Sequence, residues 1–388
     1  MPQINFKSKL PNTGTSIFSV MSALANTHQA INLSQGFPNF DCDERLKELV
    51  FQHLKLGHNQ YAPMPGLESL RSRLAQKAQM LYGLGLNADT EITITAGATQ
   101  AIFTAIATFV NPGDEVIILE PAYDSYRPAI LVQGGTPVAI PLHPPGFRPD
   151  FDRIKKAISP RTRMLIINSP HNPTGMVWSQ QDMEDLANIL EDTDVLLLSD
   201  EVYEHLTYDG IPHQSVLRFP ELYKRSLLTY SFGKTFHSTG WKIGYCIAPA
   251  ELSAEFRKVH QFNVFSVNTP MQYALADFLE SPDVYTGLSA FYQEKRDFFL
   301  DALADSPLRP LNCSGTYFQL FDYSAISDLP DLEFAKWLTR ELGVASIPLS
   351  PFYSAGSDAR LLRFCFAKTP DVLQQAAEVL SGLKEHRP

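Results

Sequence analysis

The sequence predicts an α/β protein whose main sheet is mostly parallel and is covered by helices on both faces. The first observation is that short apolar runs alternate with segments of helical periodicity between residues 67 and 248. The second is a change of pattern after residue 304, where alternating strands and helices follow a long helical stretch. The third is size, because 388 residues with a 44% hydrophobic fraction suffice for about two to three domains with large cores.

In the first region, each element is expected from its own pattern. Helices are expected where apolar residues recur at helical spacing, at 67–82, 100–109 and 180–189. Strands are expected at short apolar runs that end in turn residues, namely 92–95, 116–119, 137–141, 164–167, 195–198, 227–230 and 243–248. Together they predict a large domain with a seven-stranded sheet.

The second region predicts a smaller α+β domain. A long helix is expected over 282–304, strands over 316–323 and 361–367, and helices over 332–342 and 371–383. We expect the N-terminal segment to complete this domain. The expected division is therefore an N-terminal segment of the small domain (1–44), a large domain (45–280) and the rest of the small domain (281–388).

One glycine pattern is not interpreted as a dinucleotide site. Residues 83–88 match the pattern G-x-G-x-x-A, but they follow a predicted helix and precede a predicted strand. A dinucleotide site requires the reverse order, strand then turn then helix. Gly83 is instead expected to end the helix in a left-handed conformation.

Charge and cysteine content exclude several classes of function. The formal net charge of −10 argues against nucleic acid or an anionic membrane surface as a partner. The four cysteines lie far apart, so neither a metal site nor a disulfide framework is expected, and a cytoplasmic location fits best. Residues 1–7 lack the apolar core of a leader, and no stretch reaches the roughly 18 apolar residues of a membrane span.

Lys234 is the most informative single residue. It follows the apolar run 226–232 in a Ser/Gly-rich turn, and a second cation, Lys242, comes eight positions later. Such a lysine suits an amine that attacks an aldehyde beside a phosphate. Taken alone, the pattern favours the ordinary interpretation, because most lysines in such turns are solvated surface charges.

Two upstream segments place polar side chains in similar positions. Residues 168–175 follow one predicted buried strand and residues 199–203 follow the next. Open α/β sheets bind their ligands at such carboxyl ends of strands. The ordered set Asn172, Asp200, Tyr203 and Lys234 resembles the signature of the fold-type I aminotransferases, which depend on pyridoxal phosphate.

The resemblance extends over nearly the whole chain. Further segments that are similar to this family lie at 35–38, 61–66, 95–101 and 362–366. Within the family, the chain resembles most the kynurenine-aminotransferase-like subgroup, and there its methionine-specific bacterial members. The resemblance implies the fold-type I architecture and pyridoxal 5'-phosphate as cofactor.

Five residues are candidates for holding the cofactor ring. Lys234 would bind its aldehyde carbon, and the carboxylate of Asp200 would keep the ring nitrogen protonated. By resemblance, Tyr203 and Asn172 would contact the ring's phenolic oxygen, and Tyr123 would stack on the ring. Lys234, Asp200 and Tyr203 are the expected catalytic residues.

The phosphate needs hydrogen-bond donors and positive charge. Gly97, Ala98 and Thr99 lie between a predicted strand and a predicted helix, where free N–H groups favour an anion. Ser231 would add a hydroxyl and Lys242 a cation.

Each of these candidates also has an ordinary structural interpretation. Asp200 could cap the turn that follows it, and Thr99 could be a helix N-cap. Residues 172–175 could simply form a turn. Tyr203 and Tyr123 could be core aromatic residues.

The expected substrates are an amino acid and a 2-oxo acid. Arg363 lies on an otherwise apolar strand and is the candidate for the substrate carboxylate. By resemblance, Gly36 and Asn172 lie beside it, and Phe18 and Phe37 line an apolar side-chain pocket. Such a pocket suits methionine above all, then phenylalanine, tyrosine, leucine or kynurenine, rather than aspartate.

The resemblance also implies a homodimer with shared active sites. Tyr61 would reach the phosphate in the neighbouring subunit, and Phe265 would line that subunit's substrate pocket.

The expected function is an aminotransferase with a ping-pong cycle. One alternative is a cysteine-conjugate β-lyase, which uses the same cofactor chemistry. A second is a non-catalytic regulator that binds pyridoxal phosphate. Against the regulator, only about 66 residues precede the large domain's first helix, and they contain no basic helix-turn-helix pattern.

Overall fold

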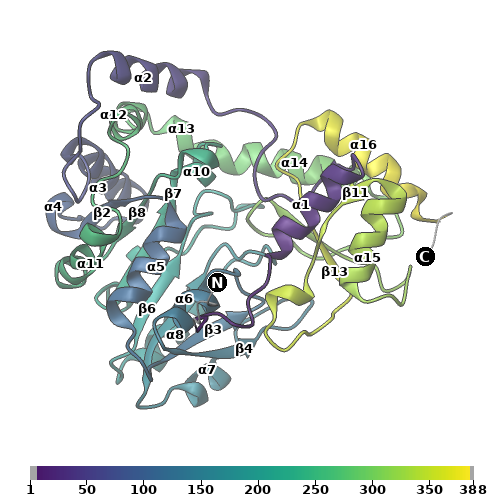
Figure 1. Cartoon of the computed structure of the whole chain (residues 1–388), viewed down its shortest axis with the longest axis horizontal. Coiled ribbons are helices and arrows are strands. Elements are labelled where there is room, and N and C mark those ends of the chain that lie inside the picture. Colours follow the sequence, from purple (N-terminus) through teal and green to yellow (C-terminus); the bar gives the residue numbers. More distant parts are fainter. Residues whose placement is uncertain (1–6, 385–388) are drawn as a thin grey trace, which may run out of the picture.

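A seven-stranded sheet forms the centre of the larger part of the molecule (Figure 1). The computed structural model describes residues 7–384. All strands of this sheet run in one direction except β8, which is antiparallel to both of its neighbours. In spatial order the strands are β2 (Ile92–Thr95), β8 (Gly244–Ile247), β7 (Ser226–Ser231), β6 (Leu196–Asp200), β5 (Thr162–Asn168), β3 (Glu115–Glu120) and β4 (Thr136–Pro141). The prediction of a mostly parallel seven-stranded sheet is confirmed.

Helices cover both faces of this sheet because its strands are apolar on both sides. In β5, Met164 and Ile166 belong to one core cluster, whereas Leu165 and Ile167 belong to the other, since successive side chains point to opposite faces. The first cluster includes residues of α5, α6 and α11, and the second includes residues of α3, α7 and α8. The helices of this part are α2 (Glu44–Lys55), α3 (Glu68–Tyr82), α4 (Ala88–Glu91), α5 (Ala98–Phe109), α6 (Tyr126–Val132), α7 (Phe151–Ala157), α8 (Gln180–Leu190), α9 (Pro220–Tyr223), α10 (Phe232–Thr235), α11 (Ala250–Asn263) and α12 (Thr269–Phe278).

Two helix ends follow directly from local chemistry. At the start of α8, the Ser179 hydroxyl accepts from Asp182 N at 3.1 Å, and the Asp182 carboxylate accepts from Ser179 N at 2.7 Å. At the end of α3, Gly83 has a φ of +75°, which confirms the expected left-handed helix end.

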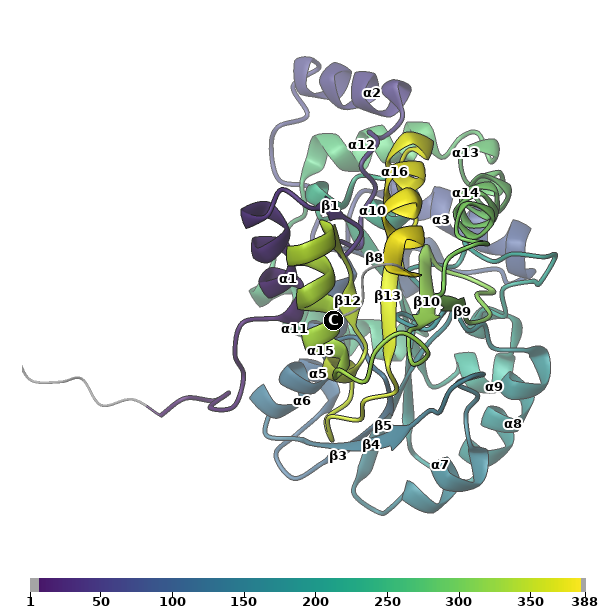
Figure 2. The same cartoon turned by 90° about the vertical axis from the view of Figure 1, so that its right-hand side faces the viewer.

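A smaller antiparallel sheet forms the other part of the molecule and faces the viewer in Figure 2. Its strands, in spatial order, are β12 (Ile347–Pro348), β13 (Leu361–Cys365), β10 (Phe318–Asp322) and β9 (Arg309–Pro310). The N-terminal segment contributes α1 (Ile17–Thr27) and β1 (Ile31–Asn32), and β1 pairs in parallel with β11 (Val344–Ala345). The remaining helices are α13 (Asp283–Thr286), α14 (Leu288–Ala302), α15 (Asp331–Trp337) and α16 (Pro370–Ser381).

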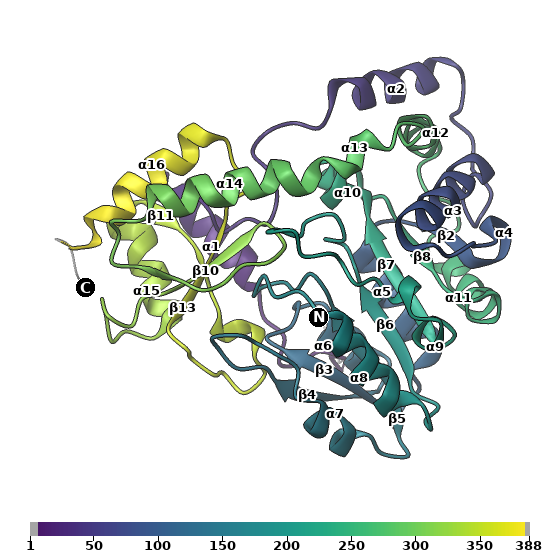
Figure 3. The same cartoon turned by 180° about the vertical axis from the view of Figure 1, so that it is seen from behind.

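The two parts are linked by α14, which runs from the large part to the small one (Figure 3). Residues 1–6 of the expected N-terminal segment lie outside the described residues. The exact domain boundaries at 44 and 280 stay predictions.

Three predicted elements differ in detail from the structure. The helix expected over 282–304 is two helices, α13 and α14, which meet at Gly287, a residue of low helix propensity. The strand expected from 316 begins at Phe318, because Thr316 has a left-handed φ of +66°. The helix expected over 332–342 is α15 followed by a π-helical turn at 338–342.

Within residues 7–384, no helix combines the length and the apolar character that crossing a membrane requires.

Candidate active site

A cavity lies where β5, β6 and β7 end, beside the beginning of α5. Parallel strands share one carboxyl edge, so the polar residues that follow them meet there. Ten of the residues predicted for the cofactor line this cavity, namely Gly97, Ala98, Thr99, Tyr123, Asn172, Asp200, Tyr203, Ser231, Lys234 and Lys242.

The first turn of α5 forms one end of the cavity. The helix begins at Ala98, and Gly97 precedes it with a φ of +82°, which favours glycine. A Cβ at Gly97 would lie 3.4 Å from Nζ of Lys242, so this cation stands directly beside the helix N-terminus. Free backbone N–H groups together with a cation make a suitable anion site.

Thr99 is not the N-cap of α5, so that alternative is wrong. Gly97 occupies the N-cap position, and no side chain among the described residues caps this helix. The Thr99 hydroxyl instead lies 3.3 Å from the hydroxyl of Tyr123. Thr99 and Tyr123 both line the cavity, so the Thr99 hydroxyl is not used to cap the helix and lies at the cavity wall.

Asp200 also lines the cavity and is 4% exposed. Its Oδ2 accepts from the hydroxyl of Tyr126 at 2.6 Å, and its Oδ1 accepts from Val202 N at a longer 3.3 Å. Burial raises the pKa of Asp200 to about 6. The carboxylate therefore does contact the following turn, as the structural alternative expected, and it also borders the cavity.

Asn168 fastens the two loops that carry the predicted ring contacts. Its Nδ2 donates to Asp200 O at 2.8 Å, and its Oδ1 accepts from Asn172 N at 2.8 Å. Residues 172–175 do form a turn, in which Gly175 N donates to His171 O at 2.8 Å. The turn interpretation is therefore confirmed, and this turn also places Asn172 at the cavity.

Arg363 reaches the cavity region from the small sheet. It is 1% exposed and donates to Asn172 Oδ1 at 2.8 Å and to Ser34 O at 3.2 Å. Its guanidinium lies 3.8 Å from the ring centre of Phe318, and its Nε has no partner among the described residues. A buried cation with a free donor is prepared to bind an anion.

Lys234 projects from α10 at the end of β7. Its Nζ donates to Gly36 O and to the hydroxyl of Tyr317, each at 2.9 Å. Burial lowers the pKa of Lys234 to about 8. At neutral pH a useful fraction of this amine is therefore unprotonated, which nucleophilic attack and proton abstraction both require.

The other predicted residues do not line this cavity. Phe18 lies near it, 5.2 Å from the guanidinium carbon of Arg363. Phe37 is 44% exposed and borders a separate hollow with Lys368. Tyr61 is 80% exposed and packs edge-on against Phe265, which is 51% exposed.

Four residues of the site were not predicted, namely Tyr126, Asn168, Tyr317 and Phe318. Asn168 ends β5 within the segment already singled out, so its strand-end position was an available signal. Tyr126 lies three residues after Tyr123, at the start of α6. Phe318 begins β10 of the small sheet and Tyr317 immediately precedes it, and no local sequence pattern links either residue to Lys234.

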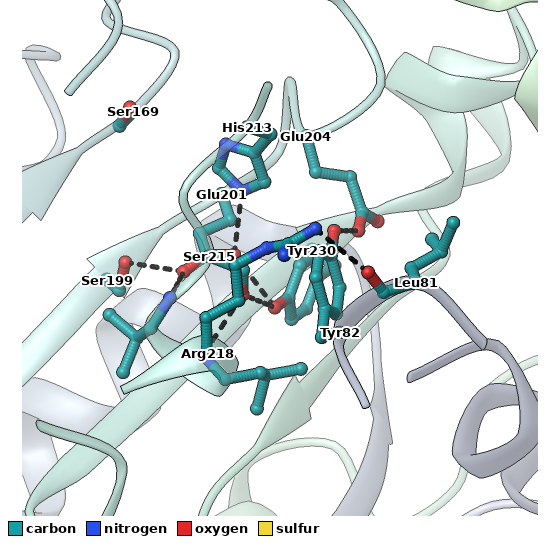
Figure 4. A network of polar contacts seen from close by, with 12 residues as sticks. Leu81, Tyr82, Ser169, Ser199, Glu201, Glu204, His213, Ser215, Arg218 and Tyr230 are labelled. Carbon is teal, nitrogen blue, oxygen red and sulfur yellow. Dashed lines mark hydrogen bonds and ion pairs between the residues drawn. The ribbon is translucent and has the colours of Figure 1, made fainter. Parts of the chain in front are cut away.

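A buried polar network supports the loop that carries Asp200 and Tyr203 (Figure 4). Glu201 accepts hydrogen bonds from Ser199, Val216 N and Tyr230, at 2.9 to 3.0 Å. Glu204 accepts from Tyr82 at 2.6 Å and pairs with Lys77. Asp200, Val202 and Tyr203 of this loop thus line the cavity. Glu201 and Glu204 of the same loop face the network.

The arrangement fits pyridoxal phosphate. Asp200 is a buried carboxylate whose hydrogen-bond donors are neutral, so a protonated ring nitrogen would supply the missing positive charge. The N-terminus of α5 with Lys242 suits the phosphate, and Lys234 lines the same cavity.

Comparison with known proteins gives the same assignment. Residues 28–380 match the model of the family described as aminotransferase class I and II. The methionine aminotransferase of Escherichia coli (strain K12) is 52% identical over 378 residues, which cover 97% of this chain and 98% of that protein. The kynurenine–oxoglutarate transaminase of Dictyostelium discoideum is 35% identical over 412 residues, covering 96% and 95%.

The fold is also found among solved structures. A crystal structure from Escherichia coli, reported with a methionine aminotransferase function, superposes with a TM-score of 0.96 at 51% identity. The match covers 98% of this chain and 100% of that one.

Proposed function

Because the chain belongs to the class I and II aminotransferase family and is a pyridoxal-phosphate-dependent aminotransferase, we propose that its amino donor is an apolar amino acid, methionine before others. The observation that carries this proposal is the 52% identity to a methionine aminotransferase over 97% of the chain. The aromatic surroundings of Arg363 support it, because Phe18, Phe318 and Phe352 all lie within 5.5 Å of its guanidinium carbon. Apolar rings beside the expected carboxylate contact favour an apolar substrate side chain.

We propose the following roles for the cavity residues. Asp200 would hold the ring nitrogen, and Asn172 and Tyr203 would hold the phenolic oxygen. Thr99 and Lys242 would hold the phosphate, with Ser231 and the N–H groups of Ala98 and Thr99 beside them. Tyr123 would stack on the ring.

Lys234 would hold the cofactor covalently and then act as the base. The bound cofactor supplies an electron sink that makes the Cα proton of the substrate acidic. Once the substrate has displaced it, Nζ of Lys234 would take that proton and return it at a different carbon. Hydrolysis would then release the 2-oxo acid and leave the amino group on the cofactor, which completes the first half of a ping-pong cycle. Arg363 would fix the substrate carboxylate and so direct the Cα proton toward Lys234.

We also propose a homodimer in which Tyr61 and Phe265 serve the neighbouring site. Their exposure supports this, since both rings are large, apolar and turned outward in the single chain. A reducing compartment such as the cytoplasm is proposed because all four cysteines are buried and unpaired.

A half-reaction screen tests the substrate proposal. The cofactor-loaded protein is mixed with one amino acid at a time, without an acceptor, and the loss of the absorbance of the lysine-bound cofactor is timed. Methionine is expected to react fastest, and aromatic amino acids and leucine next. Fast reaction with aspartate and none with methionine would contradict the proposal.

The variant Lys234→Ala is the control for the mechanism. It is expected to lack the absorbance of the lysine-bound cofactor and to lose nearly all turnover, because general acid–base catalysis alone contributes about 10²- to 10⁴-fold. Substantial transamination by this variant would show that another group does the chemistry. Release of pyruvate and ammonia from a cysteine conjugate, measured in parallel, reports any β-lyase activity.

A further inference from the structure

Tyr317 is the one tyrosine whose hydroxyl hydrogen-bonds to Nζ of Lys234 in the described part of the chain. Its hydroxyl donates to Gly36 O at 2.6 Å and accepts from Nζ of Lys234 at 2.9 Å. Nζ also donates to Gly36 O at 2.9 Å, so the three groups form a closed triangle. Tyr317 is completely buried, and it immediately precedes β10 of the small sheet, whereas Lys234 follows β7 of the large sheet.

The position of this hydroxyl is fixed by packing on several sides. The ring of Tyr317 contacts those of Tyr203, Phe318 and Tyr292, with centroid distances of 5.2, 4.9 and 5.7 Å. The backbone beside it is anchored as well, because Thr316 N donates to Leu206 O at 3.0 Å. A side chain held in this way has little freedom to turn its oxygen away.

The direction of the hydrogen bonds determines what Tyr317 offers to the lysine. A tyrosine hydroxyl has one proton, and here that proton goes to Gly36 O. The oxygen is therefore left as an acceptor facing Nζ. An acceptor stabilises the charged ammonium over the neutral amine, which opposes the effect of burial on the pKa of Lys234.

We propose that Tyr317 is a positioning residue for Lys234. Whenever the ε-amine is not bonded to the cofactor, Tyr317 holds it beside Gly36 O. The hydroxyl oxygen of Tyr317 also sets the proportion of ammonium to neutral amine at Lys234, because it accepts a hydrogen bond from Nζ. This inference rests on the proposed role of Lys234. After the substrate has displaced it, Lys234 would be a free amine. In that form, the amine has to stay close to the substrate without being held by a covalent bond.

The chain provides a matched control in Tyr292. This tyrosine is also fully buried and packs 5.7 Å from the ring of Tyr317. Its hydroxyl has no hydrogen-bond partner among the described residues. Tyr317→Phe and Tyr292→Phe thus remove the same atom from the same aromatic cluster, but only the first removes a bond to Lys234.

The first measurement follows the capture of the cofactor rather than turnover. Cofactor-free full-length protein is mixed with saturating pyridoxal phosphate, and the growth of the absorbance of the lysine-bound cofactor is recorded across pH. Only the neutral amine attacks, so the acid limb of the rate profile reports the pKa of Lys234. For Tyr317→Phe, we expect this limb to move to lower pH by about one unit, because a hydrogen bond to a charged group is lost.

The second measurement separates binding from chemistry in the half-reaction with methionine. The limiting rate of Tyr317→Phe is expected to fall by about tenfold to a hundredfold, since misplacing a reacting group by about 1 Å has effects of that size. The half-saturating methionine concentration is expected to change little, because Arg363 is untouched. Tyr292→Phe should match the wild type in both measurements.

Two outcomes would overturn the inference. One is an acid limb and a limiting rate for Tyr317→Phe that coincide with those of Tyr292→Phe. The other is a shift of the limb to higher pH, which would mean that the hydroxyl donates to a neutral amine. Lys234→Ala, measured alongside, separates this failure from that of the proposed function: if Lys234→Ala still shows the lysine-bound absorbance, the role of Lys234 itself is wrong.

Discussion

At the scale of single residues, the buried carboxylate of Asp200 lowers the stability of the cofactor-free protein, although it is proposed to bind the cofactor. The carboxylate is buried, its donors are neutral, and burial raises its pKa to about 6. In the unfolded chain the same carboxyl has a pKa near 3.8. Folding without the cofactor therefore disfavours the ionised form, so this group destabilises the cofactor-free protein above pH about 6 and ceases to do so below about 4.

Asp200→Asn is accordingly expected to have opposite effects on stability and on cofactor binding. At neutral pH the cofactor-free variant should be more stable than wild type by about 1 to 3 kcal/mol, because the buried charge is gone. Its affinity for pyridoxal phosphate should fall by about 100-fold or more, because a charge-assisted hydrogen bond is lost. Denaturant unfolding without cofactor and a binding titration measure the two effects.

The control for this prediction is Asp305→Asn, since Asp305 is exposed. That variant should lie within about 0.5 kcal/mol of wild type. A loss of stability in cofactor-free Asp200→Asn would contradict the interpretation of Asp200 as a strained carboxylate.

At the scale of elements, the loop after β6 is held from behind by a buried ion pair. Glu204 and Lys77 are both buried, and the hydroxyls of Tyr82 and Tyr245 also donate to Glu204. Figure 4 shows Glu204 and Tyr82 within this network. Burial alone would raise the pKa of Glu204, but Lys77 and His205 hold it well below its usual value. This network fastens α3 and β8 to the loop that presents Asp200 and Tyr203 to the cavity.

Lys77→Met is expected to destabilise the protein by about 3 to 5 kcal/mol, because it leaves an unpaired buried carboxylate. Glu204 has a lowered pKa in the folded state, so its contribution is present above its unfolded value and is lost as the pH falls through the folded one. In the variant, Glu204 takes up a proton at a higher pH. The stability difference, measured by denaturant unfolding, should therefore shrink on acidification.

Lys258→Met is the matched control, since Lys258 pairs with Glu255 at 2.6 Å on the surface. Breaking that exposed pair should cost about 1 kcal/mol or less. Equal losses in the two variants would show that the buried pair does not anchor the loop.

At the scale of the whole molecule, two of the predicted residues that do not line the cavity are proposed to serve the neighbouring subunit. Tyr61 and Phe265 pack against each other and are 80% and 51% exposed. In a symmetric dimer, each chain can offer such residues to the site of its partner.

Hybrid dimers test whether Tyr61 acts on the neighbouring site. Tyr61→Ala and Lys234→Ala proteins, each expected to be weakly active or inactive, are unfolded together and refolded as a mixture. If Tyr61 serves the partner, each hybrid dimer has one site with both residues intact, and about a quarter of all sites regain activity. If Tyr61 serves its own chain, no intact site forms and activity is not restored, whatever the oligomeric state found by sedimentation.

Much of the fold and part of the site follow from local sequence patterns. Apolar runs that end in polar turns located all seven strands of the large sheet, because a strand buried on both faces must be apolar throughout. The same turns identified Asn172, Asp200 and Lys234, since parallel strands end at a common edge. Local patterns were less reliable where backbone conformation changes within an element, as at Gly287 and Thr316.

By itself, then, the sequence determined the order of the strands along the chain and the edge of the sheet where the predicted cofactor residues gather, and it supplied the proposal for Lys234. Only the tertiary structure decided which distant residues complete that edge. Tyr317 meets Lys234, Tyr126 meets Asp200, and Lys77 meets Glu204, each across a separation of more than 70 residues. Such contacts arise when whole elements pack together, and hydrogen bonds between elements leave no periodic signal in the sequence of either partner.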